Sequence, residues 1–208
     1  MSAKETYDEL AQLGSATVYE GGGRGGYIEA DLIQVVPGSR VAGPARTVRC
    51  GQDDNLMVHA AMAAVHHGEV LVLTMPEPRP IALVGDLLAT QAKAQGAAAI
   101  LVDASVRDVE ELRELGLPIW ARWVRIKGAT KDIVGSIGEP VTVGGATIRT
   151  GDILVLDADG IAVVEQGRVD AVLAGARKRL GNERVKRSKL QAGELSYDLD
   201  GLREKVEA

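Results

Sequence analysis

Two short apolar runs, each followed by a helical pattern, limit the possible folds of this chain more than any other feature. The first run covers residues 81–84 and precedes a helical pattern at 86–95. The second covers 98–102 and precedes a turn at 103–106 and a helical pattern at 107–115. Apolar runs this short suit strands that are buried on both faces, and glycines end both helical patterns. The order strand, helix, strand, helix predicts parallel strands in an α/β protein.

Charged side chains follow both predicted strands. Asp86 comes directly after the first, and the adjacent Arg107 and Asp108 come after the second. Twenty residues separate Asp86 from Arg107, which is one β-α-β repeat, so we expect both turns at the sheet edge where open sheets bind ligands. The free amides of Leu87 and Leu88, in the first turn of a helix, suit an anion. The pattern predicts a divalent cation held by the carboxylates beside an anionic substrate.

This arrangement resembles the class II pyruvate aldolases of the 4-hydroxy-4-methyl-2-oxoglutarate/4-carboxy-4-hydroxy-2-oxoadipate aldolase family. An Asp, twenty residues and an Arg-Asp pair mark that family, and Asp86, Arg107 and Asp108 match this motif. The resemblance extends over about residues 14–164, most of the chain. The family also includes the regulator of ribonuclease E activity A, a non-enzymatic relative that lacks the Asp of the Arg-Asp pair. The presence of Asp108 therefore favours the enzyme.

The resemblance implies an activity and a role for each residue of the motif. The enzyme is expected to use Mg²⁺ or Mn²⁺ to cleave a 4-hydroxy-2-oxo acid into pyruvate and a second oxo acid, with oxaloacetate decarboxylation as a side activity. Asp108 is expected to bind the metal directly, and Asp86 to hold water bound to that metal and to order the water that acts as base. The substrate is expected to contact Arg107 and Asp86 together with Gly85, Leu87 and Leu88.

Three further residues are candidates for the same site. Asn55 and His59 match the Asp-Asn-Leu-x-x-His segment of the aldolase-like family, which suggests a place near the pocket. Enzymes that resemble this chain build their sites between subunits, so Glu194 is a candidate for reaching the site of a neighbouring copy.

Other interpretations of these residues stay open on the sequence alone. Asp86 and Asp108 also suit simple capping of their helices. A Schiff-base aldolase would need a lysine in an apolar pocket, and Lys93 is the only lysine near the motif. The fold would also serve as a binding trimer without catalysis, as in the ribonuclease E regulator.

The composition limits the class of protein. A chain of 208 residues suits one domain, and with 3% aromatic residues its core must consist mainly of Ala, Val, Leu and Ile. The net charge of −5 argues against a nucleic-acid partner. A single cysteine, Cys50, excludes an internal disulfide and a cysteine zinc site. No apolar run reaches the roughly 18 residues of a membrane span, and the N-terminus lacks a signal-peptide core, so the expected location is the cytoplasm.

The order of elements along the whole chain indicates an α/β/β sandwich. A helix at 54–67, which contains all three histidines, accompanies the mostly parallel strands, and short strands after residue 131 predict an antiparallel second layer. The resemblance implies the swivelling-domain fold shared with phosphohistidine domains, assembled as a homotrimer or homohexamer. We expect one catalytic domain over residues 1–180, with a final helix over 168–180. A charged helical tail is expected over 181–208, at a subunit interface.

Overall fold

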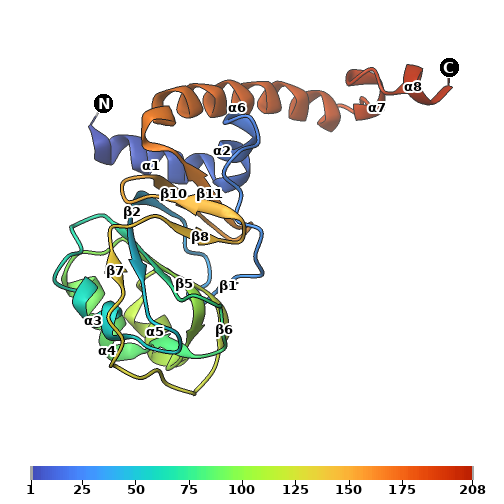
Figure 1. The fold of residues 1–208 in the computed structure, drawn as a ribbon. Helices are drawn as coiled ribbons and strands as arrows, with labels where there is room; N and C mark the ends of the chain where they lie inside the picture. The colour runs from blue at the N-terminus through green and yellow to red at the C-terminus, as the bar shows by residue number, and fades with distance from the viewer. Residues whose placement is uncertain (1, 208) are drawn as a thin grey trace.

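The computed structural model describes residues 2–207 and shows an α/β fold built on one mixed sheet (Figure 1). In the described part of the chain the sheet has nine strands in the order β1-β6-β5-β3-β2-β10-β11, with β4 attached to β5 and β7 attached to β2. Its strands are β1 (Ile33–Gln34), β2 (Val41–Arg49), β3 (Val70–Thr74), β4 (Ala82–Val84), β5 (Ala99–Val106), β6 (Ile119–Val124), β7 (Ser136–Ile137), β10 (Ile153–Leu156) and β11 (Ile161–Val164).

The predicted β-α-β repeat lies at the centre of this sheet. Strands β2, β3, β5 and β6 are parallel neighbours, and β4 also pairs with β5 in parallel. Strands β3, β4 and β5 are buried along their whole length, as continuous apolar runs in a covered sheet require. The α/β class and the parallel central strands are therefore confirmed.

The sequence predicted that the antiparallel strands would form one separate layer, and the structure does not show such a layer. Within residues 2–207, only β8 (Val141–Val143) and β9 (Ala146–Ile148) make a second sheet, a hairpin turned by Gly144 and Gly145. Strands β10 and β11 instead extend the main sheet. The physical reason is the length of β2: its first half pairs with β10, and its second half pairs with β3. The swivelling-domain assignment stays a prediction.

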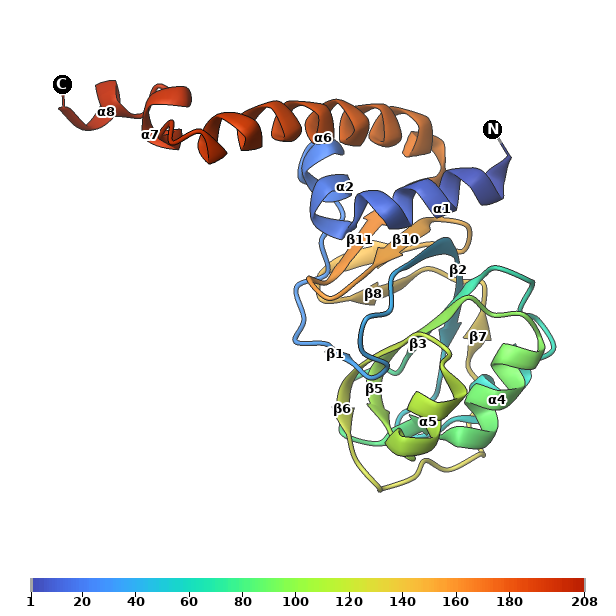
Figure 2. The same cartoon turned by 180° about the vertical axis from the view of Figure 1, so that it is seen from behind.

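Helices cover the sheet in two groups (Figures 1 and 2). Leu83, Leu88 and Leu112 belong to a core that the first group shares with the central strands, while Leu10 and Leu173 belong to a core under the second group, against β10 and β11. The first group is α3 (Leu56–Ala61), α4 (Asp86–Ala94) and α5 (Val109–Leu115), and the second is α1 (Ala3–Leu13), α2 (Ser15–Gly21) and α6 (Val169–Gln191). A 3₁₀ turn (Gln166–Arg168) precedes α6, and α7 (Ser196–Leu199) and α8 (Arg203–Glu207) follow it.

Two predicted helix boundaries were wrong. Helix α3 ends at Ala61, because the following amides bond to carbonyls three residues back and the His66 amide donates to Glu69 (2.8 Å). His66 and His67 therefore lie outside the helix. At the other end of the chain, α6 continues without a break through residue 180, where we expected the final helix to end and the tail to begin.

The turn predicted at 103–106 is also wrong, because β5 continues to Val106. Asp103 is buried in this strand and accepts a hydrogen bond from Arg122 of the neighbouring β6. Burial raises the pKa of the Asp103 carboxyl, and the guanidinium acts against this rise. The cross-strand ion pair allows a residue typical of turns to lie within a buried strand. In residues 2–207 no helix is long and apolar enough to cross a membrane.

Candidate functional site

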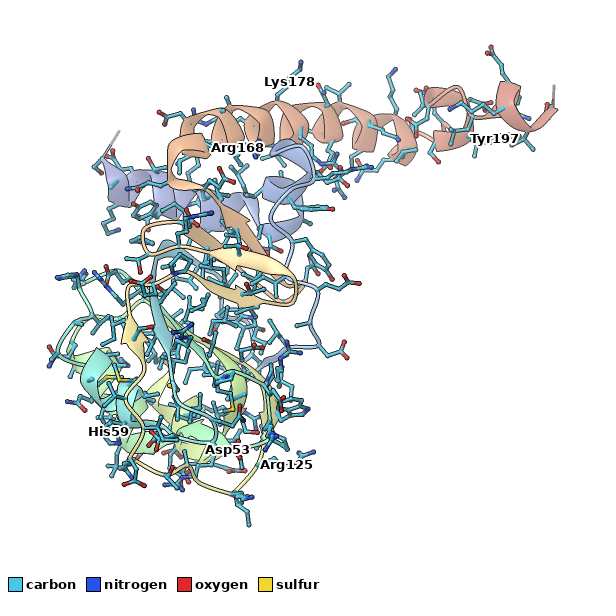
Figure 3. All side chains as sticks on the ribbon, in the orientation of Figure 1. Asp53, His59, Arg125, Arg168, Lys178 and Tyr197 are labelled. Carbon is cyan, nitrogen blue, oxygen red and sulfur yellow. The ribbon has the colours of Figure 1, made fainter. Side chains whose placement is uncertain are left out.

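A pocket of about 350 Å³ opens where β4 and β5 end and α4 and α5 begin. This end of the molecule is opposite α6: His59 and Arg125 lie on one side of Figure 3, and Arg168 and Lys178 on the other. The pocket contains every residue of the predicted motif. Its lining is Asn55, His59, Ala82, Leu83, Gly85, Asp86, Leu87, Leu88, Arg107, Asp108, Glu111, Gly128, Ala129 and Lys131.

The Asp108 carboxylate connects the two turns that carry the motif. The Asp86 amide donates a hydrogen bond to Oδ2 of Asp108 (3.1 Å), and Nε of Arg107 lies 3.6 Å from the same oxygen. The Arg107 amide donates to the carbonyl of Val84 (3.1 Å), which holds the second turn against the end of β4. The twenty-residue spacing therefore does what the sequence predicted: it brings the two turns together.

Neither carboxylate acts as a simple helix cap. Gly85, not Asp86, is the N-cap of α4, and Asp86 is the first residue of the helix, with its Oδ1 accepting from Thr90 (3.3 Å). Asp108 is the N-cap of α5, but its side chain makes no capping hydrogen bond. It lies in the left-handed region (φ 60°, ψ 48°) and reaches across to the other turn. Asp adopts this conformation more readily than most residues with a Cβ, and here it directs the Asp108 side chain to the other turn.

Two glycines leave the space that the Asp108 and Arg107 side chains occupy. A Cβ on Gly85 would lie 2.4 Å from Oδ2 of Asp108, and a Cβ on Gly128 would lie 2.9 Å from Nη1 of Arg107. Both distances are shorter than van der Waals contact, so any larger residue would displace the side chain that it meets. Gly85 thus shapes the site through its missing side chain.

The start of α4 presents donors to the pocket. The first helical hydrogen bond runs from the Ala89 amide to the Gly85 carbonyl (3.1 Å). The preceding amides of Leu87 and Leu88 have no acceptor within residues 2–207. Helix N-terminal amides with the macrodipole behind them stabilise negative charge. The site therefore offers an anion two amides beside the Arg107 guanidinium.

The structure also places the weaker candidates. Asn55 is the N-cap of α3 and His59 lies within this helix, and both residues line the pocket. The Asn55 amide nitrogen donates to the carbonyl of Leu83 (3.0 Å), while its buried Oδ1 has no partner in the described chain. Glu194 follows α6 and is exposed; it does not line the pocket of its own chain.

Six lining residues were not among the predicted site residues: Ala82, Leu83, Glu111, Gly128, Ala129 and Lys131. Glu111 lies one helical turn after Asp108, a spacing that the sequence does reveal. Gly128 and Lys131 come from a loop whose path depends on tertiary contacts. Its Thr130 hydroxyl and Asp132 amide each donate to Oδ2 of the buried Asp54 (2.6 Å), which fixes the loop over the pocket.

The lysine needed for Schiff-base chemistry does not face the pocket. Lys93 lies at the far end of α4 and donates to the carbonyl of Leu115 (2.5 Å). Lys131 is the lysine that lines the pocket, but it is exposed, whereas a Schiff-base lysine needs an apolar pocket. The geometry therefore does not favour a Schiff-base enzyme.

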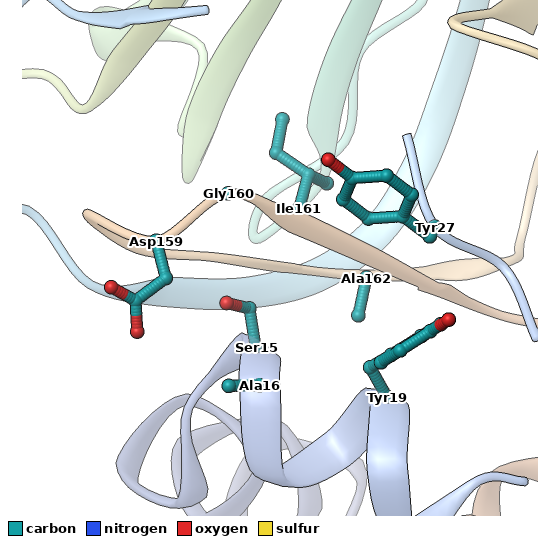
Figure 4. A pocket seen from close by; sticks show the side chains of 8 residues that line it. All are labelled: Ser15, Ala16, Tyr19, Tyr27, Asp159, Gly160, Ile161 and Ala162. Atoms are coloured by element: carbon teal, nitrogen blue, oxygen red, sulfur yellow. The ribbon is translucent and has the colours of Figure 1, made fainter. Parts of the chain in front are cut away.

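A second pocket, of about 220 Å³, lies between α2 and the turn before β11 (Figure 4). Tyr19 and Tyr27 line it with small apolar residues. Ser15 in this pocket is already engaged, because its amide and hydroxyl donate to the two oxygens of Asp157 (2.7 and 2.6 Å). No residue of the predicted motif lines this pocket, so the motif pocket remains the candidate site.

Comparison with known proteins agrees with the motif. A family model described as RraA-like, Aldolase/RraA, matches residues 10–163. A Halalkalibacterium halodurans protein named "Putative 4-hydroxy-4-methyl-2-oxoglutarate aldolase" is 36% identical over 147 residues, 71% of this chain and 70% of that protein. Among solved structures, Streptomyces coelicolor RraAS2, an unusual member of the RNase ES inhibitor RraA protein family, is 28% identical with a TM-score of 0.79 and covers 89% of this chain and 97% of its own. The RNA-processing inhibitor RraA from Thermus thermophilis is 30% identical with a TM-score of 0.62, over 66% and 84% of the two chains.

Proposed function

The chain belongs to the RraA-like family, and from this premise we propose that it is a divalent-metal-dependent aldolase. It cleaves a 4-hydroxy-2-oxo acid, of the 4-hydroxy-4-methyl-2-oxoglutarate or 4-carboxy-4-hydroxy-2-oxoadipate type, into pyruvate and a second oxo acid. Oxaloacetate decarboxylation is its side activity. We further propose that it acts in the cytoplasm as a homotrimer or homohexamer.

One observation carries this proposal: Asp86, Arg107 and Asp108 converge on one pocket although they come from two turns. The contact between the Asp86 amide and Asp108 joins the turns, and Arg107 lies beside the Asp108 carboxylate. Helix capping does not account for the arrangement, because neither aspartate caps its helix through its side chain. A cation and an anion bound side by side do account for it.

The residues fit Mg²⁺ or Mn²⁺. Oδ2 of Asp108 accepts from Asp86, while Oδ1 has no donor in the described chain and is left for a cation. Residues 2–207 contain no cluster of three His, Cys, Asp or Glu side chains able to enclose a metal. Mg²⁺ is typically held by one or two carboxylates, water and substrate oxygens, so an open carboxylate suits it. When bound, the cation withdraws electrons from the 2-oxo group as a Lewis acid.

The residues of the chain supply the remaining steps. Arg107 and the amides of Leu87 and Leu88 bind the carboxylate of the 2-oxo acid and orient the C3–C4 bond. Water ordered by Asp86 takes the proton of the C4 hydroxyl as that bond breaks. Arg107 stabilises the negative charge that develops on the C2 oxygen. The same water then returns the proton to C3, which yields pyruvate.

The relatives named as inhibitors of RNA processing or of RNase ES favour a second candidate function. In this alternative the chain is a binding protein without turnover, similar to the ribonuclease E regulator. The alternative gives no function to the pocket, to the left-handed Asp108 or to the unpaired amides. We therefore rank it second.

Pyruvate release from oxaloacetate and from 4-hydroxy-4-methyl-2-oxoglutarate separates these candidates. We expect turnover with Mg²⁺, loss of turnover with EDTA, and a fall in kcat/KM of at least roughly 100-fold for Asp108→Ala, since a Lewis acid contributes several kcal/mol. Glu110→Ala is the matched control, because Glu110 is exposed in the first turn of α5 and does not line the pocket. Turnover that is unchanged in Asp108→Ala would refute the metal enzyme, and no turnover together with binding to ribonuclease E would support the regulator.

A further inference from the structure

The second pocket, which we call the tyrosine pocket, shares no residue with the motif pocket. It has a volume of about 220 Å³ and lies between α2 and the turn before β11. Two tyrosines, one carboxylate and otherwise small or aliphatic residues line it. The proposed aldolase chemistry uses none of these groups, so the pocket is free for another ligand.

Two aromatic rings form one side of the tyrosine pocket (Figure 4). The ring centroids of Tyr19 and Tyr27 lie 5.9 Å apart, and the ring planes are inclined at 56°. Tyr27 is 53% exposed, although a β-bridge to Ala162 of β11 holds its backbone in place. Aromatic rings attract further rings in tilted or edge-to-face arrangements. This side of the pocket therefore offers a fixed aromatic surface to a ligand.

A single charged side chain, Asp159, lies on the other side of the pocket (Figure 4). It belongs to the turn between β10 and β11, where its amide donates to Oδ1 of Asp157 (3.0 Å). The Asp159 carboxylate itself is exposed, and within residues 2–207 it accepts no hydrogen bond and forms no ion pair. No lysine, arginine or histidine lines the pocket. The lining therefore has one negative charge without a counterion.

The charge and the rings together select the chemical class of the ligand. An anion would meet the Asp159 carboxylate, whereas an ammonium group would pair with it through a charge-assisted hydrogen bond. The tyrosine rings favour an aromatic body over an aliphatic one. The volume of about 220 Å³ is smaller than the roughly 300–1,000 Å³ of sites for drug-sized molecules. The ligand is therefore about as large as one amino-acid side chain.

We propose that the tyrosine pocket binds a small arylalkylamine, in which a short chain joins an aromatic ring to an ammonium group. The ammonium group lies at Asp159, and the aromatic ring packs against Tyr19 and Tyr27. The chain between them crosses the small residues in the middle of the pocket, where Figure 4 shows Ala162. This binding site is independent of the aldolase function, because no residue of the motif pocket takes part in it.

Tyramine and 4-ethylphenol test this proposal, because they share a phenol ring with a two-carbon chain and differ in the ammonium group. Dissociation constants are measured by ligand-observed NMR at low ionic strength. We expect tyramine to bind at least about fivefold more tightly than 4-ethylphenol, and salt to reduce this difference. Nα-acetyl-lysine amide presents an ammonium group as a polypeptide does. Tighter binding of this compound than of tyramine would show a protein side chain as the occupant and would overturn the proposal.

Variants of the lining locate the binding. Asp159→Asn removes the charge without removing a contact of the folded chain, so it should weaken tyramine binding about fivefold and leave 4-ethylphenol binding within about twofold. Tyr27→Leu should weaken the binding of both compounds, since it removes an aromatic surface. Glu139→Gln, at an exposed carboxylate outside the pocket, is the control. Equal affinities for tyramine and 4-ethylphenol, no binding of tyramine, or unchanged tyramine binding in Asp159→Asn would overturn the proposal.

Discussion

At the scale of single residues, the site depends on glycine at position 85, which has no side chain. Gly85 leaves the space that Oδ2 of Asp108 occupies, and Gly128 leaves the space beside the Arg107 guanidinium. Gly85 has φ −131°, which any residue adopts, so the missing Cβ and not backbone freedom explains its presence. Alanine at this position is therefore a test of packing in the site.

Gly85→Ala should reduce pyruvate release much more than it reduces stability. The new Cβ would displace the Asp108 carboxylate, and a misplacement of about 1 Å in a site typically costs roughly 100-fold in rate. Measurement of kcat/KM and of the thermal midpoint checks this expectation. Gly167→Ala is the control, because nothing lies within 4 Å of its Cβ position; equal activity of the two variants would contradict this role of Gly85.

Arg107→Lys should also reduce kcat/KM, by roughly 100-fold, although the positive charge is kept. A planar guanidinium binds a carboxylate and the neighbouring oxo group through fixed donors, and an ammonium does not reproduce this geometry. Arg125→Lys, at an exposed arginine that does not line the pocket, provides the comparison. Steady-state kinetics at saturating Mg²⁺ would show the difference, and wild-type kinetics of Arg107→Lys would argue against a substrate contact.

At the scale of elements, the pocket depends on one buried carboxylate. Asp54 accepts hydrogen bonds from Thr130 and Asp132 of the pocket loop and from Leu56 at the start of α3. Burial acts to raise the pKa of Asp54, but these hydrogen bonds outweigh it and hold the pKa below its usual value. The carboxylate thus attaches the loop with Gly128 and Lys131 to the helix that carries His59.

Asp54→Asn should lower the free energy of unfolding at pH 7 by about 2 kcal/mol, because the amide cannot accept all three hydrogen bonds. A carboxyl whose pKa is lowered by folding stabilises the folded protein above its unfolded pKa of roughly 3.9, and this stabilisation is lost as the pH falls through the folded pKa. Below about pH 4 the difference between the two proteins should therefore shrink. Urea unfolding from pH 3 to 7 measures the difference in the free energy of unfolding. Asp53→Asn, at the half-buried neighbouring residue, is the control. A difference between Asp54→Asn and wild type that stays constant over this pH range would show that the charge of Asp54 does not contribute to stability.

The elements that the sequence revealed are those fixed by local patterns. Apolar runs and helix-ending glycines located β4, α4 and α5, and the Asp-to-Arg spacing located the pocket. Long-range contacts decided the rest. The ion pair of Asp103 with Arg122 keeps β5 extended through a segment that looked like a turn, and the attachment of the loop to Asp54 brings Lys131 to the pocket. Neither partner can be identified from sequence spacing.

At the scale of the whole molecule, the motif pocket lies far from the last helices. The pocket is at the end formed by α3, α4 and α5, whereas α6, α7 and α8 lie beyond α1 and α2 at the opposite end (Figure 1). The family model matches residues 10–163, so it covers every residue that lines the pocket but not α6, α7 and α8.

The central claim is that a cation at Asp108 and a 2-oxo acid at Arg107 occupy one pocket together. A crystal structure obtained with Mn²⁺ and pyruvate, with anomalous diffraction data collected for manganese, tests it most directly. We predict an anomalous peak beside the Asp108 carboxylate and pyruvate between that ion, Arg107 and the amides of Leu87 and Leu88. A pocket without manganese and pyruvate at saturating concentrations of both, or manganese bound only elsewhere, would contradict the claim.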